Sequence, residues 1–164
     1  MKTFLIHFVI AAFAVNLFFT QLNWLHFTAF NSLLVFFVVF MLLWLSAALY
    51  NKSYFRKIPK VVGLSFFFLK ELIMANLKIA YDIITPRYFM NPAIIALPLK
   101  ASTDVEISLL ANMLTLTPGS LSVDVSEDRT KLYVHLLYAA DENIEDIKLE
   151  LKNGFEKRIL EITR

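Results

Sequence analysis

LLANMLTLTPGSLSVDVSEDRTKLYVHLL, residues 109–137, carries the strongest local structural signals of this chain. Within it, Pro118-Gly119 predicts a type II turn, because proline presets the φ of the second turn position and glycine accepts the positive φ of the third. Two runs of alternating apolar and polar residues follow, at 120–125 and 132–136. The polar residues 126–130 between them have the length of a hairpin loop, so we expect an antiparallel pair of strands.

The alternation within each run assigns the side chains to two faces of the expected sheet, one of them buried. The residues expected on the buried face are Leu121, Val123, Val125, Leu132, Val134 and Leu136. The residues expected on the opposite face are Ser120, Ser122, Asp124 and His135. We therefore interpret His135 as a sheet residue, with a ligand or general base as the alternative.

The segments flanking the hairpin predict a helix on each side. Thr103 and Glu106 form a T-x-x-E capping box before the hairpin, which predicts a helix that ends at Pro118. Its expected apolar positions are Val105, Leu109, Leu110 and Met113. After the hairpin, Asp141 can cap a last helix. Six residues of that helix fall within an arc of about 120° and predict its buried face: Ile144, Ile147, Leu151, Phe155, Ile159 and Ile162.

A proline-punctuated connector precedes these elements, with prolines at 86, 92 and 98. The apolar run 93–97 between the last two prolines predicts a strand near a sheet edge. The order strand, helix, strand, strand, helix is typical of a small α+β domain, in which helices cover one face of a mostly antiparallel sheet. We assign this domain to residues 87–164.

The composition predicts that a membrane portion precedes the α+β domain. Hydrophobic residues make up 58% of the 164 residues and the mean hydropathy is +0.61, above the apolar share of ordinary soluble domains. Residues 1–84 carry seven Lys or Arg and two acidic residues, whereas residues 85–164 carry nine and twelve. A basic membrane half is thus joined to a mildly acidic soluble half, and neither half is typical of a nucleic-acid-binding protein.

Two apolar segments are candidate membrane helices. Residues 4–20 would form a helix of about 26 Å, at the short end of what spans a bilayer. The triplet Ala12-Phe13-Ala14 has the form of a signal-peptidase site, but the apolar run continues beyond it and a second run follows, which favours an uncleaved anchor. The polar break 21–26, with Trp24, is expected to be a short loop at the membrane interface.

The second segment, residues 27–50, has no charged residue and would form a helix of about 36 Å. Four basic residues follow directly: Lys52, Arg56, Lys57 and Lys60. Such clusters stay on the cytoplasmic side, so the hairpin of residues 1–60 is expected to begin and end inside, closed by a basic loop. The cluster could also hold anionic lipid.

Residues 61–84 predict an amphipathic helix, within a segment that we delimit as 61–86. Its more polar positions fall within an arc of about 120°: Gly63, Lys70, Glu71, Lys78, Tyr81 and Asp82. A membrane-spanning orientation would place Lys70 and Glu71 near mid-depth, where each costs about 2.5–3.5 kcal/mol without a partner. We therefore favour a helix on the cytoplasmic surface or against another subunit, with a third span as the alternative. In the spanning case Lys70 and Glu71 become candidate ion-pathway residues, and otherwise they are the solvated face of the helix.

Motifs of catalysis and cofactor binding are missing from the sequence. There is no histidine pair with metal-ligand spacing, no glycine-rich phosphate loop and no nucleophile elbow. The lack of cysteine excludes disulfides, thiolate metal sites and thiol nucleophiles. We assign no catalytic, cofactor or metal residue and do not expect an enzyme. His7 and His26 are interpreted as local hydrogen-bonding residues, with proton relays as the alternative.

The segment ANMLTLTPGSL (residues 111–121), followed by LYVH (132–135), resembles the E subunit of the bacterial multisubunit sodium/proton antiporters of the Mrp or Mnh type. Further positions that resemble the family are Ala75, Asn76, Asp82, Pro86, residues 94–99, Phe155, Glu156 and Arg158. The similarity covers most of the chain, although the first two apolar segments match only in hydropathy. Ser120 is a small departure, since threonine is commoner there in the family.

The resemblance implies a subunit of a large complex in the bacterial cell membrane that exchanges monovalent cations for protons, with other membrane subunits and the lipid bilayer as partners. The E subunit is not usually credited with ion conduction, which implies an accessory or structural role. The residues agree, because two spans lack the broken helices and buried charge chains of a self-sufficient transporter. The alternative is a free-standing membrane-anchored module that binds a ligand or a protein. The carried cation stays open.

Overall fold

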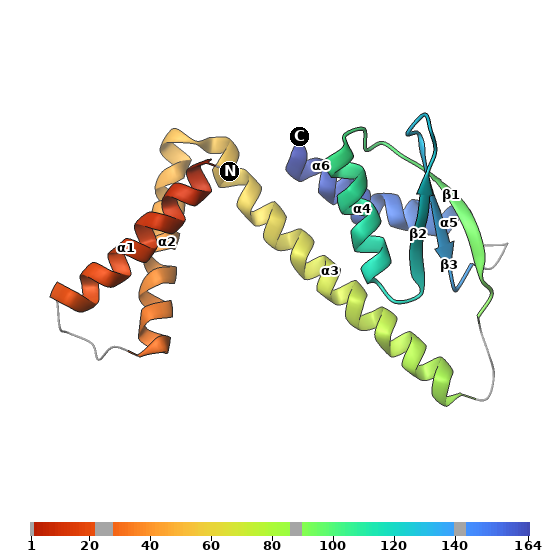
Figure 1. The fold of residues 1–164 in the computed structure, drawn as a ribbon, viewed down its shortest axis with the longest axis horizontal. Coiled ribbons are helices and arrows are strands. Elements are labelled where there is room, and N and C mark those ends of the chain that lie inside the picture. The colour runs from red at the N-terminus through yellow and green to blue at the C-terminus, as the bar shows by residue number, and fades with distance from the viewer. Residues whose placement is uncertain (1, 22–27, 86–89, 140–143) are drawn as a thin grey trace. The chain divides into compact units, whose positions relative to one another are not determined.

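The computed structural model describes residues 2–21, 28–85, 90–139 and 144–164, and the chain forms two units, residues 1–59 and 60–164. The first unit contains α1 (Lys2–Gln21), α2 (Ala29–Tyr50) and the start of α3 (Lys52–Ile84) (Figure 1). Helices α1 and α2 pack through aromatic pairs, with ring centroids 5.8 Å apart for Phe4–Phe40 and 5.2 Å for Phe8–Phe36. Both are long and apolar enough to cross a membrane, as predicted. Of the predicted loop 21–26, Gln21 is helical, and Trp24 and His26 lie outside the described residues.

The basic segment 52–60 is helical, so the predicted loop is wrong there. Asn51 starts the helix, because its side-chain oxygen accepts the backbone N–H of Tyr54 at 3.1 Å. Pro59 lies inside the helix and cannot donate to the carbonyl of Phe55 four residues earlier. The indole N–H of Trp44 donates to that carbonyl at 3.3 Å, so the lost backbone hydrogen bond is replaced from α2.

The second unit contains the rest of α3 and an α+β fold, as predicted. Its further elements are β1 (Ala93–Pro98), α4 (Asp104–Leu116), β2 (Ser120–Val125), β3 (Lys131–Leu136), α5 (Ile144–Leu151), the π-helical η2 (Lys152–Glu156) and α6 (Lys157–Thr163). The three strands are antiparallel in the order β1-β3-β2, which places β1 at an edge as expected. Pro86 and the proposed cap Asp141 lie outside the described residues.

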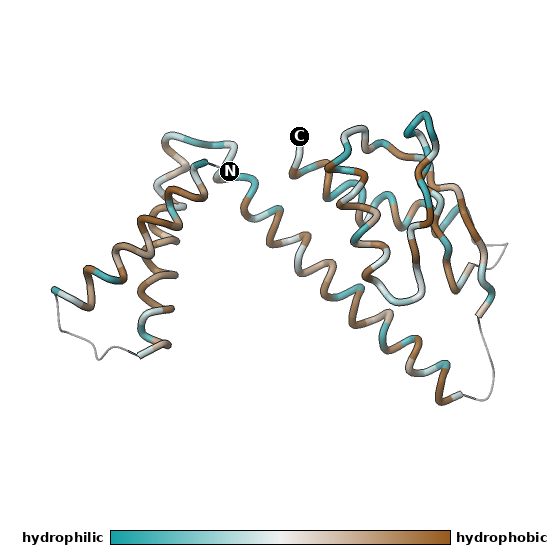
Figure 2. The backbone as a smooth tube through the Cα atoms, viewed as in Figure 1, coloured by the Kyte–Doolittle hydropathy of each residue, from teal (hydrophilic) through white to brown (hydrophobic). Residues whose placement is uncertain are grey.

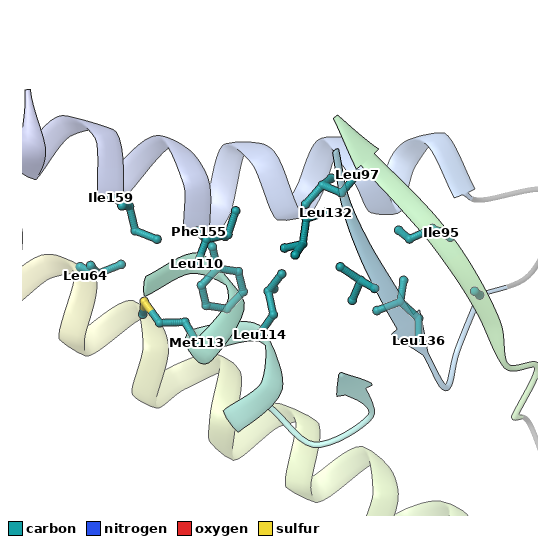
Figure 3. Close-up of a cluster of buried hydrophobic side chains, with 12 residues drawn as sticks. Leu64, Ile95, Leu97, Leu110, Met113, Leu114, Leu132, Leu136, Phe155 and Ile159 are labelled. Atoms are coloured by element: carbon teal, nitrogen blue, oxygen red, sulfur yellow. The ribbon is translucent and has the colours of Figure 1, made fainter. Parts of the chain in front are cut away.

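One face of the sheet packs against α4 and the C-terminal helices. The buried cluster combines residues from both sheet and helices (Figure 3): Ile95, Leu97, Leu110, Leu114, Leu132, Val134, Phe155 and Ile159. The predicted buried faces of β3 and of the last helix are therefore confirmed. In α4 the prediction is partly wrong, since Val105 is 70% exposed and Leu109 faces outward as well, whereas Glu106 and Ile107 are buried.

The face assigned to β2 is also wrong at its start. Leu121 and Val123 are exposed, and Ser120 and Ser122 lie on the side of α4. The reason is the close approach of β2 to α4: the hydroxyl of Ser120 donates to the carbonyl of Leu114 at 2.6 Å, and that of Ser122 to the carbonyl of Ala111 at 3.0 Å. These hydroxyls donate hydrogen bonds to backbone carbonyls of α4. Leucine or valine at these positions has no donor to do so. A bulge between Ser122 and Asp124 then returns Val125 to the inner face.

The turn between α4 and β2 has the predicted type. Gly119 has φ of 90°, and the N–H of Ser120 donates to the carbonyl of Thr117 at 3.2 Å, as in a type II turn.

Gly119→Val should lower the free energy of unfolding by about 1–3 kcal/mol, because a β-branched residue is disfavoured at positive φ. Thermal unfolding of the full chain measures the loss. The control Gly63→Ala, at a helical glycine with open space around it, should not destabilise the chain, and equal stability of both variants would contradict the assigned turn.

The predicted capping box at the start of α4 is present. Glu106 is 2% exposed, and its carboxylate accepts the backbone N–H of Ser102 at 3.0 Å and the hydroxyl of Thr163 at 2.7 Å. These hydrogen bonds, the one from Ser102 first, lower the pKa of Glu106 to about 2. Glu106 therefore joins the start of α4 to the end of α6 as an ionised group.

Candidate functional site: the polar side of helix α3

One side of α3 is attached to the α+β fold along most of the helix length. In the first half of the helix, the ammonium of Lys60 donates a hydrogen bond to the backbone carbonyl of Glu161 at 2.8 Å. Leu64 belongs to the buried cluster (Figure 3). In the middle, the rings of Phe67 and Phe155 meet edge-on with centroids 5.1 Å apart. Because these contacts combine apolar packing with a hydrogen bond, they hold the helix in one rotational setting.

Gly154 permits the close approach in the middle of the helix. A Cβ atom at position 154 would lie 2.9 Å from Cζ of Phe67, which is closer than side-chain atoms normally pack. Arg158 lies over the same ring, with its guanidinium carbon 4.5 Å from the Phe67 centroid. The π-helical turn η2 contains Gly154 and the core residue Phe155. The middle of α3 therefore packs against the irregular segment of the last helix.

The last turns of α3 are attached through Tyr138, which follows β3. Its hydroxyl donates to the carboxylate of Asp82, which is 2% exposed. Lys78 lies over the ring of Tyr138, with its ammonium 3.7 Å from the centroid. The hydrogen bond to Asp82 raises the pKa of Tyr138 to about 12, with burial adding to the effect. Tyr138 is therefore a hydrogen-bond donor at neutral pH, a state suited to holding two elements together.

A groove of about 550 Å³ lies between α3 and the α+β fold. It is bordered by Glu71 and Lys78 on α3, by Pro118-Gly119 on the predicted turn and by Tyr138. Apolar side chains complete the lining: Met74, Leu77, Leu136, Ile147, Leu151 and Phe155. The structure thus brings the 118–119 turn and the polar side of α3 to one place.

The candidate ion-pathway residues Lys70 and Glu71 form an ion pair, with 3.5 Å between Nζ and Oε1. Their side chains are 71% and 35% exposed. Only part of the predicted polar arc faces the α+β fold. Lys78 and Asp82 contact Tyr138, and Glu71 borders the groove, whereas Tyr81 is exposed.

The sequence did not point to Tyr138 and Gly154 as contact residues, because their partners are distant in the chain. It includes Asp82 in the polar arc and in the family resemblance, but it does not predict a partner for this residue.

Two of the three histidines, His7 and His135, lie within the described residues. His7 is 3% exposed, and its Nε2 is hydrogen bonded to the hydroxyl of Tyr50, which is the local hydrogen bonding that we expected. His135 lies in β3 on the face opposite Val134, paired with Leu121 and Ile94 of the neighbouring strands. This is the expected sheet position. His26 lies outside the described residues.

Hydropathy separates α3 from the two preceding helices. Figure 2 shows α1 and α2 as mostly hydrophobic, whereas hydrophilic and hydrophobic residues alternate along α3. Only α1 and α2 qualify as candidate membrane spans among the described residues.

Comparison of the sequence with known families and proteins gives three results. Residues 4–162 match a family described as "Na+/H+ ion antiporter subunit". The chain is 37% identical over 126 residues to the Na(+)/H(+) antiporter E subunit of Alkalihalophilus pseudofirmus, covering 77% of this chain and 78% of that protein. It is 35% identical over 114 residues to the protein of the same name from Bacillus subtilis, covering 70% and 71%.

Among solved structures, a chain of the membrane-bound sulfane sulfur reductase, an archaeal respiratory membrane complex, superposes with a TM-score of 0.57. The match covers 99% of both chains at 22% sequence identity. The two chains therefore share a fold.

Proposed function

Because the chain belongs to the family of Na+/H+ antiporter E subunits, we propose that it is an accessory subunit of a multisubunit monovalent cation/proton antiporter, required for assembly and not itself the ion conductor. Its partners are then the other membrane subunits of that complex and the lipid bilayer. The chain is a component of a transport complex in the cell membrane, and its role is structural rather than enzymatic.

The observation that carries this proposal is the scarcity of ionisable groups in α1 and α2. Between Lys2 at one end and Tyr50 at the other, the described part of these helices holds one titratable side chain, His7, which is bonded to Tyr50. A proton path needs several such groups in series across the bilayer. Lys70 and Glu71 do not extend such a series, because their pair is solvent-exposed.

Antiport in inverted vesicles tests the role. Deletion of this subunit should remove most of the assembled complex on native electrophoresis and most antiport, because many contacts are lost at once. The neutral variants Lys70→Met and Glu71→Gln should retain most antiport, since each loses one exposed ion pair worth about 0–1 kcal/mol. Loss of antiport in either variant with the complex fully assembled would assign conduction to α3. A chain that migrates alone in mild detergent would favour the free-standing module.

We further propose that the hairpin of residues 1–60 crosses the membrane twice and that residues 61–86 and the α+β domain, 87–164, are cytoplasmic. The supporting feature is the basic cluster at the start of α3, directly after α2. Cysteines introduced at Ser53 and Glu161, both exposed, should resist a membrane-impermeant thiol reagent in intact cells and react after permeabilisation. A cysteine at Asn23, between the two spans, should react in intact cells. Reaction at position 161 alone would mean that α3 crosses the membrane.

A further inference from the structure

The side of α3 that faces away from the α+β fold is a continuous apolar surface. Four of its residues, Phe66, Leu69, Ile73 and Ile84, are between 48% and 82% exposed. At 100° per residue, Phe66, Leu69, Ile73 and Ile84 fall within an arc of about 60°. Leu64 and Asp82, which contact the α+β fold, fall on the opposite side. The rotational setting of α3 thus places its polar contacts inward and its apolar side outward.

The contacts along α3 decide between a surface helix and a third span. They run from Lys60 to Asp82, a distance of about 33 Å along a helix, which is as long as the hydrocarbon core is thick. If α3 crossed the bilayer, the α+β fold attached to it would lie in hydrocarbon, with the Lys148–Glu145 ion pair and the exposed hairpin loop around Asp128. The cost of placing such charged groups in lipid excludes that orientation.

The bilayer surface is the occupant that the apolar side of α3 fits best. Helix α2 ends at Tyr50 and α3 begins at Lys52. The start of α3 is therefore connected directly to the C-terminal end of the candidate membrane helix α2. The first turns of α3 carry Lys52 and Arg56, which complement anionic headgroups. Lys70 flanks the apolar side, and its ammonium is turned toward Glu71, away from that side.

We propose that α3 lies in the plane of the cytoplasmic membrane surface, with its apolar side in the lipid interface and the α+β fold attached to its polar side. This arrangement is typical of interfacial amphipathic helices. The inference rests on the proposed topology of α1 and α2. It assigns the apolar side of α3 to lipid, rather than to a neighbouring subunit.

Site-specific fluorescence quenching tests this arrangement, since the chain has no native cysteine. Single cysteines at Phe66, Leu69, Ile73 and Ile84 carry a small fluorophore in an assembled complex whose other subunits lack reactive cysteines. The complex is reconstituted in vesicles of phosphatidylethanolamine and phosphatidylglycerol that contain a nitroxide lipid with its label either shallow or deep in the acyl chain. The control is Val105, an apolar residue of α4 that is equally exposed.

At all four sites the shallow nitroxide should quench several-fold more than it does at Val105, and more than the deep nitroxide. A depth profile with Ile73 quenched best by the deep label and Phe66 and Ile84 by the shallow one would show a membrane-spanning helix and overturn the proposal. Quenching no greater than at Val105 would overturn it too, and would assign this side of α3 to another subunit.

Native electrophoresis and antiport measurements on each labelled complex separate the two proposals. A complex that assembles and transports but shows no quenching on α3 refutes the surface helix and leaves the accessory role intact. Conversely, quenching as expected in a chain that never joins a complex refutes the accessory role alone.

Discussion

Glu156→Ala is expected to lower the free energy of unfolding of residues 60–164 by about 2–4 kcal/mol. The Glu156 side chain is 1% exposed, and its Oε1 accepts the backbone N–H groups of Lys100 and Ala101, the latter at 2.9 Å. Truncation would leave the buried N–H of Ala101 and the part-buried N–H of Lys100 without this partner, at about 1–3 kcal/mol for each lost hydrogen bond. Since these residues connect β1 to α4, the loss would loosen the attachment of the last helix to the rest of the fold.

Urea-dependent proteolysis of the full chain in mild detergent measures this difference. Glu161→Ala removes an exposed glutamate from the same helical region and should change the free energy by less than about 0.5 kcal/mol. Glu156→Gln should lose less than Glu156→Ala, because an amide oxygen can still accept from the backbone. If Glu156→Ala matched Glu161→Ala, the two backbone hydrogen bonds would not be contributing to stability.

Leu110→Ala should also destabilise the α+β fold, by about 2–5 kcal/mol, because it removes a fully buried side chain from the centre of the core and leaves a cavity. Leu116→Ala provides the matched control, since Leu116 lies on the same helix and is 62% exposed. The same proteolysis assay compares the two. Similar losses for both leucines would contradict the described packing of α4.

The Leu110 variant also connects folding to the proposed function. A loss of this size is a large part of the stability of a small domain, so less of the chain should accumulate in the membrane. The amount of assembled complex should fall in proportion, while antiport per assembled complex should stay unchanged. A change in the activity of each complex would indicate that the α+β fold takes part in transport itself.

Local signals in the sequence determined several elements correctly. The Pro118-Gly119 turn, the T-x-x-E box at Thr103 and the hairpin were all predicted because each depends on residues within a few positions of one another. The apolar helices α1 and α2 were predicted because length and hydropathy suffice for that. The helical start of α3 was missed, because proline and a basic run are typical of a loop. There Asn51 and the indole of Trp44 provide the compensating hydrogen bonds.

The sequence by itself determined most of the helices and strands and the two candidate membrane helices, together with the family resemblance. For β2 and α3, only the tertiary structure decided which way the element faces. Alternation in β2 defines two faces but not which one is buried, and the close approach of α4 selected Ser120 and Ser122 because their hydroxyls reach its carbonyls. Likewise, the amphipathic pattern of α3 does not reveal what each side contacts. That choice depends on Asp82 meeting Tyr138, 56 positions away, and contacts between residues so distant in the chain form only once the fold brings them together.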